Sequence, residues 1–227
     1  MPYVLLIILI LTIVFGPQLW ARHTFNRYNQ PSDKIPGTGS ELAKHLITRF
    51  ELDVKVERAA QEGDHYDPTT RTVRLSPQFF DNKSLSAVAV AAHEVGHAIQ
   101  HHRDEALLDT RTKLAHLALN AQKFGTLMIM AMPIVTAITH APASGVLMTV
   151  IFILSMGLAV LVNLMTLPVE LDASFGKALP ILIEGHYVDE ADLPAVRKVL
   201  KAAAYTYVAA SLASLLNLWR WLAILRR

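Results

Sequence analysis

Residues 93–97 have the sequence HEVGH, an H-E-x-x-H pattern inside a stretch, 84–102, that is typical of a helix. Two histidines four positions apart lie on one face of a helix, about one turn from each other. Both imidazoles can therefore reach one tetrahedral Zn²⁺, and the glutamate between them can reach a metal-bound water. The pattern predicts His93 and His97 as zinc ligands and Glu94 as the general base of a hydrolase. The alternative is an ordinary amphipathic helix with two surface histidines.

A catalytic zinc usually has a third protein ligand, and the same helix does not supply it. The astacin-like extension is absent, because Gln100 stands where that pattern needs Gly and Arg103 where it needs the third His. His101 lies one turn beyond His97, but ligands from three successive turns would spread over about 12 Å of the axis. We therefore expect the third ligand from another part of the chain.

Glu170 is the best candidate, as the first charged residue after a long apolar stretch. If 169–178 is helical, the carboxylate of Asp172 points in a different direction from that of Glu170. One can then bind the metal while the other holds a ligand histidine. Asp172 is thus either such a partner or an alternative ligand, and Glu184 and Glu190 are weaker rivals. The alternative is that these carboxylates have no role in metal binding and only mark a membrane boundary.

The polarised carbonyl of a substrate also needs a hydrogen-bond donor. His65, Tyr66 and Tyr187 are candidates for an oxyanion donor or a substrate contact. The sequence leaves the choice among them open.

Three stretches without Asp, Glu, Lys or Arg predict membrane segments: 1–21, 124–169 and 202–219. A transmembrane helix needs about 20 apolar residues, so the first stretch makes one span and a retained anchor rather than a signal peptide. The second would be about 69 Å long as one helix, so we expect a hairpin of helices 124–140 and 146–167 with a turn near Pro142 and Gly145. The third is rich in small residues, which suits packing against other membrane helices; a buried soluble helix is the alternative.

Topology follows from this arrangement. A hairpin at 124–167 places 22–123 and 170–201 on the same side of the membrane. Arginines and lysines flank these spans, which predicts a cytoplasmic site by the positive-inside rule. The positive-inside rule is not met by Arg220, Arg226 and Arg227, which follow the last segment. Either that segment does not cross the membrane or the earlier charges determine the orientation.

The absence of cysteine excludes disulfides and thiolate ligands. The basic residues form no patch, and no nucleic-acid partner is expected.

The soluble part before the metal helix is predicted to be small and mixed. A helix at 41–50 with Ser40 as its N-cap is followed by alternating strands at 52–57 and 71–76, separated by a turn cluster at 63–68. Two strands before an H-E-x-x-H helix are the zincin arrangement, in which an edge strand pairs with an extended substrate. A hairpin that merely covers the helix is the alternative. A further helix at 110–123 leads into the membrane.

Several segments together resemble the YugP-like bacterial membrane zinc metallopeptidases, a neutral zinc metallopeptidase family distantly similar to HtpX-type proteases. They are GDHYDP (63–68), TVRLS (72–76), AHEVGHAIQ (92–100), PVELDAS (168–174) and AAAYTYVA (202–209). The resemblance implies a multi-pass endopeptidase of the bacterial inner or plasma membrane. By similarity to HtpX-type proteases, the Glu of an E-x-x-A segment is the third ligand, here Glu170 with Ala173, as in gluzincins. Ser174 stands where HtpX-like chains carry Asp, with Asp172 as a substitute.

The fold class that we predict is mainly α with a small β element, a zincin-like, gluzincin-type domain embedded among about four transmembrane helices. We predict a zinc endopeptidase that acts on membrane or juxtamembrane proteins, as in quality control. A site-2-type intramembrane protease and a silent scaffold subunit are the alternatives, and a homo-oligomer or membrane-protein partner stays open. The predicted segments are an anchor (1–21), the zincin-like domain (22–123), the hairpin (124–167), the third-ligand segment (168–201) and a C-terminal membrane helix (202–227).

Overall fold

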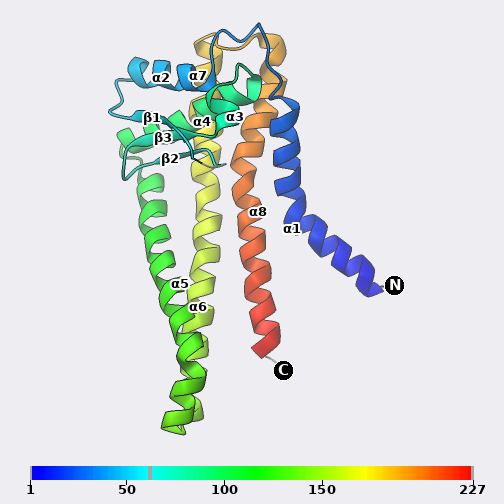
Figure 1. The fold of residues 1–227 in the computed structure, drawn as a ribbon, viewed down its shortest axis with the longest axis vertical. Coiled ribbons are helices and arrows are strands. Elements are labelled where there is room, and N and C mark those ends of the chain that lie inside the picture. The colour runs from blue at the N-terminus through cyan, green and yellow to red at the C-terminus, as the bar shows by residue number, and fades with distance from the viewer. Residues whose placement is uncertain (1, 61–62, 226–227) are drawn as a thin grey trace. The chain divides into compact units, whose positions relative to one another are not determined.

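The computed structural model describes residues 2–60 and 63–225; Met1 and Arg226–Arg227, the outer ends of the first and last predicted segments, lie outside the described residues. The chain forms two compact units, each considered by itself. The site unit comprises Phe15–Leu108 and Leu167–Thr206, and the helical unit comprises the described residues of 1–14, 109–166 and 207–227. The predicted fold class, mainly helical with a small sheet, is confirmed at that level (Figure 1). The predicted segment boundaries stay predictions.

The elements follow one another in an order that places all three strands before the metal helix. The helices are α1 (Pro2–Arg27), α2 (Gly39–Arg49), α3 (Pro77–Phe80), α4 (Leu85–His102), α5 (Ala106–Thr139), α6 (Pro142–Leu171), the π-helix η1 (Asp172–Ala178), α7 (Leu179–Glu184), the 3₁₀ helix η2 (Glu190–Asp192) and α8 (Leu193–Leu225). The strands are β1 (Lys55–Arg58), β2 (His65–Asp67) and β3 (Thr72–Leu75).

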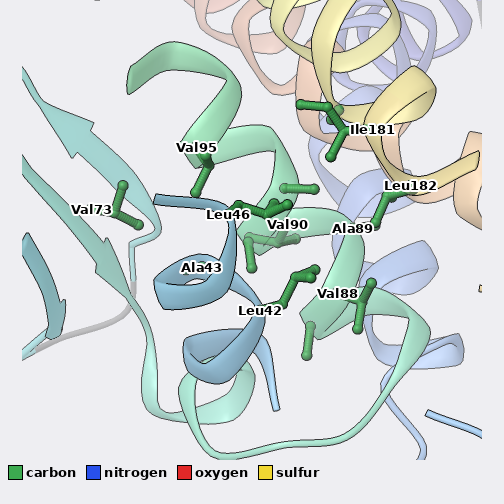
Figure 2. Close-up of a cluster of buried hydrophobic side chains, with 14 of the residues drawn as sticks. Leu42, Ala43, Leu46, Val73, Val88, Ala89, Val90, Val95, Ile181 and Leu182 are labelled. Atoms are coloured by element: carbon green, nitrogen blue, oxygen red, sulfur yellow. The ribbon is translucent and has the colours of Figure 1, made fainter. Parts of the chain in front are cut away.

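Helix α4 is the centre of the site unit. It begins after Ser84, whose side chain accepts a hydrogen bond from the amide of Ala87, and it is buried along 86–100. It contacts α2, α3, α7, η1, β2 and β3. Its alanines and valines pack against Leu42 and Leu46 of α2 and Leu182 of α7 (Figure 2). The predicted helix 84–102 is therefore correct to within one residue, and its small side chains let neighbours approach on every face.

The sheet has the order β1-β3-β2 and differs from the prediction. The two predicted strands pair with each other, but β1 and β3 run parallel, with Val56 opposite Val73. A third strand, β2, pairs antiparallel with β3 and places Tyr66 opposite Val73. It lies in the segment predicted as a turn, because its three residues are surrounded by Gly, Asp and Pro. The observed strands are shorter than the predicted 52–57 and 71–76, and because they run parallel they do not form a hairpin with each other. A substrate role for an edge strand stays a prediction.

The start of α2 also differs from the prediction. Thr38, not Ser40, is the N-cap: its hydroxyl accepts from the Glu41 amide at 3.2 Å, while Glu41 Oε2 accepts from the Thr38 amide at 2.7 Å. This reciprocal pair is a capping box. The helix consequently starts at Gly39 rather than at residue 41.

The helical unit contains the hairpin expected in the long uncharged stretch. Within the described residues, two helices are long and apolar enough to cross a membrane. The first is α5, Ala106–Thr139, and the second is the continuous helical stretch Pro142–Glu184, which joins α6, η1 and α7. The turn is tighter than predicted: α5 ends at Thr139 and α6 begins at Pro142, so Gly145 is helical. The predicted helices 110–123 and 124–140 are one continuous helix. The other two predicted spans lie on α1 and α8, which are not among those two helices.

The helices of the helical unit contact one another through small and polar side chains. Ser155 of α6 lies so close to Gly125 of α5 that a Cβ there would be 2.3 Å from the serine hydroxyl. Asn163 of α6 donates a hydrogen bond to Ser214 of α8 at 3.0 Å. Small residues and polar side chains that bond across helices are typical of membrane bundles. Large apolar side chains such as Met130 and Ile138 face outward.

Candidate metal centre

Three side chains far apart in sequence bring their donor atoms together inside the site unit. Nε2 of His93 and Nε2 of His97 each lie 3.2 Å from Oε2 of Glu170. All three residues are buried, and their ligand atoms lie within 4.8 Å of one another. Two donors, each about 2.1 Å from one tetrahedral zinc, lie about 3.4 Å apart. The two nitrogens and the carboxylate oxygen therefore fit a zinc ion in type and in spacing.

The histidines come from successive turns of α4, and Glu170 comes from the last turn of α6. Beyond Leu171 the helix changes to the π-helix η1, which packs along α4. Short π-helical segments are rare and are found often at functional sites, because the added residue shifts the register of the side chains. The expected helix 169–178 is therefore present, but with a change of winding just after the third donor.

Each histidine is held at its other ring nitrogen by a buried partner. Ser174 Oγ lies 3.0 Å from His93 Nδ1 and donates its own hydrogen to the carbonyl of Leu200 at 3.1 Å. Ser174 therefore accepts from the His93 Nδ1–H. Gln100 Oε1 lies 2.9 Å from His97 Nδ1. With Nδ1 protonated on both rings, the Nε2 atoms are the ones that face Glu170, as metal ligation requires.

Electrostatics in this centre depend on burial and on the close pairs. Burial would lower the pKa of His97, but the Glu170 carboxylate beside it raises that pKa to about 9. Burial raises the pKa of Glu94 above its usual value, although His93 and His97 oppose the shift. No residue in the described part of the chain donates a hydrogen bond to the Glu94 carboxylate. Glu94 is therefore a buried carboxylate without a hydrogen-bond donor among the described residues, and His93, His97 and Glu170 act on its charge.

Comparison with known proteins identifies a family of zinc metallopeptidases. The sequence matches the family described as "Putative neutral zinc metallopeptidase" over residues 3–226. It is 34% identical over 231 residues to "Putative membrane protease YugP" of Bacillus subtilis (strain 168). The alignment covers 99% of this chain and 96% of that protein. This chain belongs to the neutral zinc metallopeptidase family. No solved structure matches it.

The carboxylates that the sequence offers as alternative zinc ligands lie outside the group of three donors. Asp172 Oδ2 accepts from Gln100 Nε2 and from Lys177 Nζ, each at 2.8 Å, and so is engaged elsewhere. Glu184 ends α7 and Glu190 begins η2, and neither is among the grouped ligands of the described chain. Glu170 and Asp172 thus point to different partners.

The three candidate oxyanion or substrate contacts have different environments. Tyr66 Oη is hydrogen-bonded to His101 Nδ1 at 2.7 Å, and both side chains line a polar pocket at the end of α4. Burial raises the pKa of Tyr66 to about 12, so the hydroxyl keeps its proton. His65 is exposed and contacts the carbonyl of Gly63 at 3.3 Å. Tyr187 bonds to His45 and Arg49 of α2 instead.

Two residues of the centre, Gln100 and Ser174, have no role in the sequence-based prediction. Gln100 departs from the astacin-like pattern, and Ser174 departs from HtpX-like chains. Gln100 follows His97 by three positions and so shares its face, while Ser174 follows Glu170 by four. These spacings are the signals that could have indicated both.

Gly96 controls how closely η1 approaches the metal helix. A Cβ at this position would lie 2.8 Å from the carbonyl oxygen of Ala173, and this neighbour is backbone that cannot rotate away. Any side chain at residue 96 must therefore push η1 away from α4, and with it the Glu170 carboxylate.

We expect Gly96→Ala to weaken zinc binding at least about tenfold and to destabilise the fold by about 1–3 kcal/mol, as overpacking does. Alanine is otherwise the better helix former by about 1 kcal/mol, so a net loss reports the clash. Thermal unfolding and zinc competition check this. Gly157→Ala is the control, because nothing lies within 4 Å of a Cβ there. A Gly96→Ala protein with unchanged zinc affinity would contradict the role of Gly96 in setting the distance between η1 and α4.

Proposed function

We propose that this chain is a membrane-bound zinc endopeptidase with a zincin-like, gluzincin-type site formed by His93, His97 and Glu170. The observation that supports this most directly is the convergence of two imidazole nitrogens and one carboxylate oxygen at 3.2 Å, with Glu94 beside them. A bound zinc ion lowers the pKa of a coordinated water and polarises a carbonyl group.

Glu94 supplies the proton chemistry in this proposal. Its buried carboxylate accepts a proton from the attacking water and then transfers that proton to the amide nitrogen that leaves. A raised pKa suits both steps, because the group must take the proton and release it again. Tyr66, whose hydroxyl stays protonated, is the candidate that we favour to donate to the carbonyl oxygen.

Substrates in this proposal are membrane proteins or their juxtamembrane segments. Glu170 follows the apolar stretch 146–167 almost directly in sequence, which favours a site near the bilayer surface. The relative in Bacillus subtilis is named as a membrane protease. We further propose that the chain crosses the inner or plasma membrane of a bacterium with about four helices. The charge distribution favours a site on the cytoplasmic side. Membrane protein quality control is a role that fits this location.

Metal removal tests the proposal. Detergent-purified protein is incubated with an unfolded soluble substrate and with a membrane-protein substrate. We expect cleavage to stop after dialysis against a zinc chelator and to return when zinc is restored at one equivalent. A protein that binds zinc but cleaves neither substrate would favour the silent scaffold. Cleavage that persists without metal would contradict the mechanism.

A further inference from the structure

Gln100 is buried beside His97 and uses every polar atom of its amide. Its Oε1 lies 2.9 Å from Nδ1 of His97. Its Nε2 donates to the carbonyl of Val169 at 3.0 Å and to Oδ2 of Asp172 at 2.8 Å. Both of those partners are acceptors, so the NH₂ group must face them and Oε1 must face the imidazole. The amide can therefore only accept from His97.

This orientation fixes which ring nitrogen of His97 carries hydrogen. Because Gln100 offers His97 only an acceptor, the Nδ1 atom must be the donor. Nε2 then faces Glu170, with its lone pair free whenever the ring is neutral. A metal-binding histidine needs this tautomer and this ring orientation.

Gln100 is itself held by a chain of charged groups that ends at the protein surface. Lys177 Nζ lies 2.8 Å from Asp172 Oδ2 and 3.0 Å from Glu105 Oε1. The Glu105 amide donates to the Gln100 carbonyl at 3.0 Å, which closes the chain on the end of α4. Asp172 is thus pinned by an ammonium group, and its fixed carboxylate prevents the Gln100 amide from rotating.

We propose that Gln100 is a positioning residue of the metal centre, and that Asp172 and Lys177 act on His97 through it. The proposal rests on the function proposed above in that His97 is taken as a zinc ligand. It gives Asp172 a role other than that of a ligand. It also explains why a glutamine follows the second histidine at the spacing of one helical turn.

The first test compares zinc affinity, by competition with a chelator, in detergent-purified wild type and Gln100→Met. Methionine has a similar volume but removes the acceptor, and loss of such a partner typically weakens metal binding about 10–100-fold. We expect a loss in that range and a changed visible absorption spectrum of the Co²⁺-substituted protein. Ser86→Ala is the control, because Ser86 is buried on the same helix and, among the described residues, its hydroxyl bonds only to the Phe25 carbonyl. Wild-type affinity in Gln100→Met would overturn the proposal.

The second test is a rescue that a merely structural role would not produce. The double variant Gln100→Glu/Asp172→Asn moves one negative charge without changing the total. It keeps an acceptor for His97 and lets the asparagine amide donate to the glutamate, while the Val169 carbonyl loses the donor that Gln100 Nε2 provides. Because only the bond to Val169 is lost, we expect zinc affinity within about tenfold of wild type and the wild-type Co²⁺ spectrum.

The double variant also decides the question if Gln100→Met does not fold. An affinity as weak as the expected value for Gln100→Met, at least about tenfold below wild type, would overturn the proposal. These measurements use no substrate. A protein that binds zinc but cleaves nothing would contradict the proposed function and leave the role of Gln100 intact.

Discussion

Replacing Glu94 by Gln is expected to lower peptidase activity on the order of 10²–10⁴-fold, because the amide cannot accept the proton of the attacking water. The side chain keeps its shape, and Glu94 is not one of the three converging donors. Zinc content should therefore stay at one equivalent. The measurement is steady-state cleavage together with elemental analysis of the same preparation.

The matched control for this change is Glu184→Gln, which makes the same substitution at an exposed position on α7. Its activity and zinc content should equal those of the wild type. If Glu94→Gln retained full activity, Glu94 would not be the base and the proposed mechanism would fail. Loss of zinc in Glu94→Gln would instead make Glu94 part of the ligand set.

The features that could be predicted from the sequence are those encoded locally. The H-E-x-x-H spacing and the run of alanines and valines around it define the helix 84–102, and the structure starts it one residue later. Glu170 could be found because charge is absent from the preceding stretch and the predicted hairpin would return the chain to the side of the histidines. The capping box at Thr38 and Glu41 is equally local, because the S/T-x-x-E spacing indicates Thr38 rather than the predicted Ser40 as the N-cap.

The features that could not be predicted depend on tertiary approach. The π-helix has no local signature, since its winding is set where η1 packs against α4 at Gly96. Strand β2 is only three residues long and is stabilised by pairing with β3 and by Asp67, which accepts from Arg74 at 3.0 Å. The partners of the two histidines, Gln100 and Ser174, follow from the same close packing. Sequence indicates the donors, while packing determines how they are held.

Replacing Glu170 by Gln is expected to weaken zinc binding by more than about 100-fold, beyond what the loss of an outer partner costs. A neutral amide is a poor zinc ligand, and two histidines alone leave the site incomplete. The amide preserves the volume of this buried side chain, so the effect does not come from a cavity. Chelator competition on purified protein measures it.

Asp172→Asn is the informative comparison, because the site-2-type alternative makes Asp172 the ligand. The structure places its Oδ2 on Gln100 and Lys177 rather than with the converging donors. Asparagine keeps an oxygen that can accept from Gln100, so His97 stays oriented and zinc affinity should change by less than about tenfold. Equal loss in Glu170→Gln and Asp172→Asn would mean that both carboxylates bind the metal. Loss in Asp172→Asn alone would replace the His-His-Glu site with the intramembrane type.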